Sequence, residues 1–93
     1  MDVKHIFNES KGAFIIKNDT ERLAEMTYSK AGQNKIIIDH TEIDDSLRGQ
    51  GAGNKLLMEA VNYARVEKLK IIPLCPFAKS VFDKDPSISD VLA

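Results

Sequence analysis

The spacing of the apolar residues changes near the middle of the chain, where a glycine-rich segment lies. Before residue 44, short runs such as residues 12–17 and 35–43 are rich in β-branched residues and alternate as strands do. After residue 51, apolar residues recur at helical spacing as far as residue 68. Three of the five glycines, at positions 49, 51 and 53, fall where the two patterns meet. The chain is therefore expected to run from a sheet through a tight turn into a long helix.

The remaining elements are predicted from residue composition and from turn residues. Further strands are expected at residues 3–8, at the edge of the sheet, and at 22–28. A short buried strand is expected at 70–75, where Pro73 places it at an edge. A second helix is expected at 77–84, and residues 87–93 suggest a final helical turn.

This order predicts a mixed α/β (α+β) fold in a single domain spanning residues 1–93. The sheet is expected to be twisted and mostly antiparallel, and the two strands that flank the long helix are expected to be parallel, because a helical crossover joins them. Alternation in the strand at 35–43 would point one set of side chains to one face, Ile36, Ile38 and His40, and the rest to the other, Ile37, Asp39, Thr41 and Ile43.

Composition excludes several classes of function. The 93 residues carry 13 basic and 14 acidic side chains, so no excess of cations is available to neutralise a nucleic acid. No apolar run approaches the roughly 20 residues that cross a bilayer. The single cysteine suits a reducing compartment. We therefore expect a cytoplasmic protein, monomeric or weakly dimeric, with no nucleic-acid or membrane partner and no metal site.

The glycine-rich turn is suited to bind an anion. The first N–H groups of a helix lack intrahelical acceptors, the helix dipole favours negative charge there, and glycine lets a phosphate approach the backbone. Arg48 adds a cation that could grip a phosphate or the loop itself. The alternative is that the glycines only make a tight turn and let the helix pack on the strand. The residues alone leave both interpretations open.

Two nucleotide-binding motifs are excluded by spacing. A nucleoside triphosphate loop needs Lys after its last glycine, whereas Gly53 is followed by Asn54. A dinucleotide fingerprint needs glycines spaced G-x-G-x-x-G, which positions 49, 51 and 53 do not satisfy.

The spacing that fits is Arg-x-x-Gly-x-Gly, at residues 48–53. It resembles the acetyl-coenzyme A motif of the GNAT superfamily of N-acetyltransferases, and the resemblance covers residues 35–86. Within that superfamily the chain is similar to very small single-domain members with a His on the strand before the motif and a Cys at the end of the strand after the helix. His40 and Cys75 occupy those places.

The resemblance implies where acetyl-coenzyme A would bind. The loop would hold its pyrophosphate, through Arg48, Gly49, Gln50, Gly51, Ala52 and Gly53. The backbone of Thr41, Glu42 and Ile43 would pair with the pantetheine arm, between two splayed strands. The acetyl group would end near Cys75. One departure concerns the second helix, where superfamily enzymes often have Tyr four residues after an Ala as an acid; here Ala78 is followed by Phe82, which has no hydroxyl.

His40 and Cys75 are the candidate catalytic residues. His40 could deprotonate an amine acceptor, or be only a hydrogen-bonded or solvated imidazole. Cys75 could take the acetyl group itself if His40 or the N-terminus of the following helix stabilises its thiolate, or line the acyl pocket while the amine attacks directly, or be an inert buried thiol. His5 is interpreted as a surface residue, and Tyr28 and Tyr63 as half-buried packing residues.

The predicted function is transfer of an acetyl group from acetyl-coenzyme A to an unidentified amine. The rival is a non-catalytic acyl-coenzyme A binding module or sensor, which Phe82 and the shortness of the chain favour. A third hypothesis is generic phosphate binding at the helix N-terminus.

Overall fold

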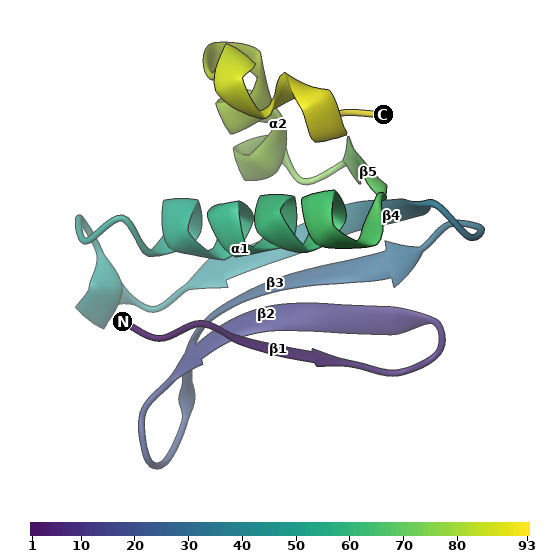
Figure 1. Cartoon of the computed structure of the whole chain (residues 1–93). Coiled ribbons are helices and arrows are strands. Elements are labelled where there is room, and N and C mark those ends of the chain that lie inside the picture. The colour runs from purple at the N-terminus through teal and green to yellow at the C-terminus, as the bar shows by residue number, and fades with distance from the viewer.

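The computed structural model describes residues 1–93 as one five-stranded sheet with two α-helices and two 3-10 helices (Figure 1). In chain order the elements are β1 (Lys4–Phe7), β2 (Lys11–Lys17), β3 (Arg22–Lys30), β4 (Lys35–Ile43), η1 (Asp45–Leu47), α1 (Ala52–Glu67), β5 (Lys70–Pro73), α2 (Pro76–Lys84) and η2 (Pro86–Val91). The strands lie in the order β1-β2-β3-β4-β5. The first four are antiparallel to their neighbours, and β5 is parallel to β4. The predicted mixed fold, with its mostly antiparallel sheet, is confirmed.

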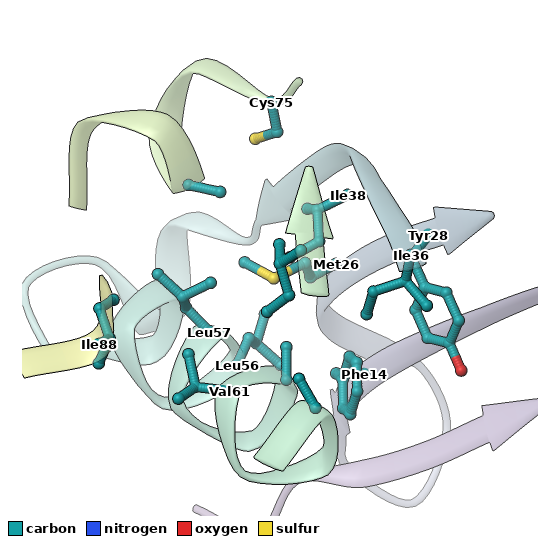
Figure 2. Close-up of a cluster of buried hydrophobic side chains, with 14 of the residues drawn as sticks. Phe14, Met26, Tyr28, Ile36, Ile38, Leu56, Leu57, Val61, Cys75 and Ile88 are labelled. Carbon is teal, nitrogen blue, oxygen red and sulfur yellow. The ribbon is translucent and has the colours of Figure 1, made fainter. Parts of the chain in front are cut away.

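The helices cover one face of the sheet. α1 lies along that face, and α2 and η2 stand beyond β5 (Figure 1). Twenty buried residues form one core cluster between these layers. Figure 2 shows how Leu56, Leu57 and Val61 of α1 meet Phe14, Met26 and other residues of the sheet. No helix is long and apolar enough to cross a membrane.

β5 is shorter than the sequence suggests. It ends at Pro73, and Cys75 is the N-cap residue of α2, with Pro76 in the first turn. Proline has no N–H to donate to a ladder and fits the first turn of a helix, where that donor would be unpaired. The prediction of one strand from 70 to 75 is therefore wrong at its end, and Cys75 lies at a helix start.

A bulge in β4 changes which face its side chains reach. Thr27 of β3 is opposite His40, but the next residue, Tyr28, is opposite Ile38, so Asp39 is the extra residue. An extra residue on one strand interrupts the alternation. Ile36 and Ile38 are buried, whereas His40 is exposed. The prediction that these three side chains share a face is wrong.

Candidate functional site

β4 and β5 separate part-way along their length. Their pairing runs from Lys35 opposite Lys70 to Ile38 opposite Pro73 and stops there. The N–H groups of Leu74 and Cys75 both donate to the Ile38 carbonyl, each over 3.0 Å, and the chain then turns away into α2. β4 continues to Ile43 with β3 as its only partner. A gap is thus left between the end of β4 and the start of α2.

The backbone of β4 presents unpaired groups to this gap. The Asp44 N–H donates to the Leu23 carbonyl over 2.7 Å. Because antiparallel neighbours alternate between hydrogen-bonded and non-bonded pairs, Glu42 also points its backbone toward β3. The N–H and C=O groups of Thr41 and Ile43 therefore point the other way, toward the missing partner strand. Of the three predicted backbone contacts, the structure brings Thr41 and Ile43 to the gap, while the backbone of Glu42 faces β3.

The glycine-rich loop carries a series of free backbone donors. Gly49 and Gly51 have φ of +77° and +73°, and a Cβ added to either would meet no atom within 4 Å. No protein acceptor receives the N–H of Gly49, Gly51, Ala52, Gly53 or Asn54. Five N–H groups in one turn, beside the positive end of the α1 dipole, make a site for an anion such as a phosphate.

Two side chains of this segment hold the loop together. Arg48 Nη2 lies 2.8 Å from Asp45 Oδ1, and Gln50 Nε2 donates to the Ser46 carbonyl over 3.1 Å. Of the two roles considered for Arg48, the structure shows the contact with the loop. Its side chain is 80% exposed, so the guanidinium remains accessible to an anion.

Gly53 allows α1 and α2 to begin side by side. A Cβ on Gly53 would lie 2.7 Å from Phe77 Cζ, closer than carbon atoms approach. The Phe77 ring thus packs on the first turn of α1. Next to it, a shallow groove runs between the two helices and is lined by residues that include Asn54, Ser80 and Lys84. Asn54 belongs both to the set of free N–H groups and to the lining of this groove.

Cys75 lies on the covered side of the gap. Its side chain is buried, with 4% of the residue exposed, at the margin of the core cluster near Ile38 (Figure 2). Cys75 Sγ lies 3.1 Å from Thr41 Oγ1, so the two side chains meet across the gap. The sequence suggests His40 or the helix N-terminus as the group beside the Cys75 sulfur, and not the Thr41 side chain, because only the bulge at Asp39 turns Thr41 toward the core.

His40 lies on the opposite face of the sheet. Its side chain is 60% exposed, and its Nε2 lies 3.5 Å from Glu42 Oε2. Across the sheet His40 is opposite Thr27, Thr27 is opposite Ala13, and Ala13 is opposite Ile6. Thr27, Ala13 and Ile6 line a depression together with Asp39. The structure therefore does not bring His40 and Cys75 into contact: the plane of the sheet separates them.

Phe82, four residues after Ala78, is part of the core. Phe82 is 6% exposed and Ala78 is fully buried, so this face of α2 packs inward. Phe82 therefore offers no hydroxyl to the gap between β4 and α2.

Comparison with known proteins gives a consistent result. The family model of the GCN5-related N-acetyl-transferase matches residues 13–91. A GCN5-like protein of Staphylococcus aureus, assigned as an N-acetyltransferase and solved by NMR, is 43% identical with a TM-score of 0.75, over 97% of this chain and 87% of that one. No curated protein matches.

Two larger acetyltransferases share the fold at low identity. The ribosomal-protein-alanine N-acetyltransferase of Brucella melitensis biovar Abortus 2308 is 14% identical with a TM-score of 0.66, over 81% of this chain and 62% of that one. Nourseothricin acetyltransferase is 18% identical with a TM-score of 0.59, over 81% of this chain and 48% of that one.

Proposed function

The chain belongs to the GCN5-related N-acetyltransferase family, and we propose that it transfers an acetyl group from acetyl-coenzyme A to an amine acceptor. The observation that carries the proposal is the gap between β4 and β5, which lies beside the loop of free N–H groups. A backbone edge and an anion site next to each other suit a ligand that carries both amides and phosphates.

The residues present fit acetyl-coenzyme A as the acetyl donor. Its pyrophosphate would be held by the free N–H groups of Gly49, Gly51, Ala52, Gly53 and Asn54, with Arg48 as an accessible cation. Its pantetheine amides would complete the ladder that Thr41 and Ile43 leave open, since unpaired backbone groups are costly to leave without partners. The donor supplies an activated acetyl thioester at the gap.

In the first of two routes, Cys75 carries the acetyl group. The Cys75 thiolate would form a bond to the acetyl carbon while the bond from that carbon to the coenzyme A sulfur breaks. The proton lost by Cys75 passes to the departing coenzyme A sulfur. A neutral amine would then attack the carbonyl carbon of the acetyl-cysteine, the bond from that carbon to the Cys75 sulfur would break, and the proton lost by the amine nitrogen would return to the sulfur.

In the second route, His40 assists a direct attack. A lysine amine has a pKa of about 10.4 and is mostly protonated at neutral pH, so a base is needed. His40 stands on the open face, where an acceptor could reach it without entering the core. Because the sheet separates His40 from Cys75, we treat the two residues as serving alternative routes from opposite faces.

Binding is tested by two glycine variants with the same backbone conformation. Gly51 and Gly32 both have positive φ, +73° and +75°, with open space around the Cβ position. Alanine at either position should cost about 1 to 2 kcal/mol of stability. We expect only Gly51→Ala to weaken acetyl-coenzyme A binding in isothermal titration, because Gly32 lies in the turn between β3 and β4. Equal affinities for both variants and the wild type, or no binding by the wild type, would contradict the proposal.

The route is tested by removing each candidate residue. If Cys75 carries the acetyl group, Cys75→Ala should abolish turnover, and intact-mass measurement of the wild type should show one acetyl adduct. If His40 assists direct attack, His40→Ala should slow turnover while leaving acetyl-coenzyme A affinity unchanged. Unchanged turnover in both variants would remove both residues from the mechanism.

The second candidate function, acyl-coenzyme A binding without catalysis, is favoured by one observation. Phe82 is buried and offers no hydroxyl where related enzymes often have an acid. Tight binding of acetyl-coenzyme A, with no transfer to a panel of amines and no adduct on Cys75, would support this function over the enzyme.

A further inference from the structure

We propose that Thr41 is a positioning residue for Cys75: its hydroxyl holds the sulfur at the gap between β4 and α2 and stabilises the thiolate form. The inference rests on the proposed function, because it concerns how the acyl-cysteine route would obtain a reactive sulfur. It assigns a role to the Thr41 side chain, whereas the binding proposal uses only the Thr41 backbone.

The geometry places the two atoms together from separate elements. Thr41 Oγ1 and Cys75 Sγ are 3.1 Å apart although the residues are 34 positions apart in the sequence. The contact crosses the region where β4 and β5 no longer pair, since their last matched residues are Ile38 and Pro73. The side chains thus meet at the place where the backbone ladder has ended.

The bulge in β4 is what makes the contact possible. Thr41 is opposite Met26, which is fully buried, so the Thr41 side chain points to the covered face of the sheet. Without the extra residue Asp39, alternation from Ile38 would place Thr41 on the open face.

Cys75 has no competing side-chain partner. As the N-cap residue of α2 it could bond the first N–H groups of its own helix, yet it makes no side-chain capping bond. The Thr41 hydroxyl is the one side-chain polar group that bonds the sulfur.

A hydroxyl can serve both protonation states of the thiol. The neutral S–H group donates to Thr41 Oγ1, and after ionisation the Thr41 O–H can rotate to donate to the sulfur. Hydrogen bonds to a charged group are stronger than those between neutral groups. Ionisation therefore replaces the hydrogen bond that the thiol donates with a stronger one that the thiolate accepts, which favours the thiolate. No further reactant is required.

The test uses the fact that Cys75 is the only cysteine. The rate of alkylation by iodoacetamide, measured against pH in the absence of acetyl-coenzyme A, reports the thiolate of this residue alone. Thr41→Val keeps the branched shape but removes the hydroxyl. We expect its alkylation midpoint to move to higher pH and its rate at neutral pH to fall about tenfold. Thr41→Ser should restore the wild-type profile.

Controls separate a hydroxyl effect from a packing effect. Thr20→Val removes a hydroxyl from the turn between β2 and β3, where it bonds only Asn18 Oδ1, and should leave the profile unchanged. Circular dichroism checks folding, and Thr41→Ala serves if the valine variant does not fold. The inference would be overturned if Thr41→Val or Thr41→Ala kept the wild-type alkylation profile, or if Thr41→Ser failed to restore that profile. A shifted profile without any acetyl adduct on Cys75 would leave Thr41 its role and reject the acyl-cysteine route.

Discussion

The His5 imidazole lies among aromatic rings, although β1 is an edge strand. Its ring centroid is 4.2 Å from that of Phe14 and 4.4 Å from that of Tyr63, and its Nε2 lies 2.6 Å from Tyr28 Oη. His5 is half-buried rather than simply a surface residue, and Tyr28 is fully buried rather than half-buried. Burial lowers the pKa of His5 and raises that of Tyr28. A neutral His5 with its proton on Nδ1 would accept, at Nε2, the hydrogen bond that the Tyr28 hydroxyl donates.

This setting predicts a loss of stability in mild acid. The pKa of His5 is held below its unfolded value of 6.5, mainly by desolvation, with Glu59 opposing and Lys30 reinforcing the shift. The unfolded chain then binds the extra proton more readily, so the stabilisation is complete above pH 6.5 and is lost as pH falls through the folded pKa. His5→Gln, which does not titrate, should show a shallower fall of Tm between pH 7 and 5. An equally steep fall would show that His5 is not responsible.

At the level of elements, Arg65 of α1 connects that helix to η2 through hydrogen bonds. Arg65 donates to both carboxylate oxygens of Asp90, over 3.0 and 2.9 Å, and to the Ser87 carbonyl over 3.0 Å. The Arg65 guanidinium lowers the pKa of the Asp90 carboxyl. The chain then continues to Ala93, whose N–H donates to the Ile71 carbonyl of β5 over 2.9 Å. Arg65 thus holds the segment that covers the outer edge of the sheet.

Removing the Arg65 contacts should let the C-terminal segment open locally while the rest of the fold stays intact. We expect Arg65→Gln to speed amide hydrogen exchange several-fold in η2 and at Ala93, with little change in β2 and β3, because local opening follows the loss of local contacts. Lys79→Gln is the matched control, since Lys79 pairs with Asp83 of its own helix. Equal exchange in Arg65→Gln and wild type would show that the other contacts hold η2 without Arg65, namely the packing of Ile88 and Val91 and the bond from Lys70 Nζ to the Asp90 carbonyl.

At the scale of the whole molecule, one core joins the sheet to all the helices. The same cluster includes Phe14 of β2, Leu56 of α1, Phe82 of α2 and Ile88 of η2. A domain with one core is expected to unfold as a single cooperative unit.

Truncating the centre of this core should therefore affect every element together. Leu56 is fully buried, and Leu56→Ala should lower the free energy of unfolding by about 3 kcal/mol. Val66 lies on the same helix but is 76% exposed, and Val66→Ala should change stability by less than about 0.5 kcal/mol. Urea unfolding followed by far-ultraviolet circular dichroism and by tyrosine fluorescence should give coincident curves. Separate transitions would show that helix and sheet unfold independently.

The sequence by itself determined the elements and their order. Alternating β-branched residues predict β4 from Lys35 to Ile43, and helical spacing predicts α1 to within a residue at each end. The order of strand, loop and helix predicts the parallel pairing of β4 with β5. These features are local, because side-chain period and backbone propensity act between near neighbours. The glycine positions likewise indicated the loop whose N–H groups are free.

Only the tertiary structure decided how the site is assembled. One extra residue at Asp39 places His40 on the open face and Thr41 on the covered face, and alternation along the sequence gives no sign of it. The end of β5 at Pro73 opens the gap and makes Cys75 a helix cap, so that its sulfur meets Thr41 and not His40. A bulge and a strand end depend on how neighbouring strands pair and pack, which no local pattern records. The sequence therefore indicates the candidate residues, whereas the fold decides which side chains they contact.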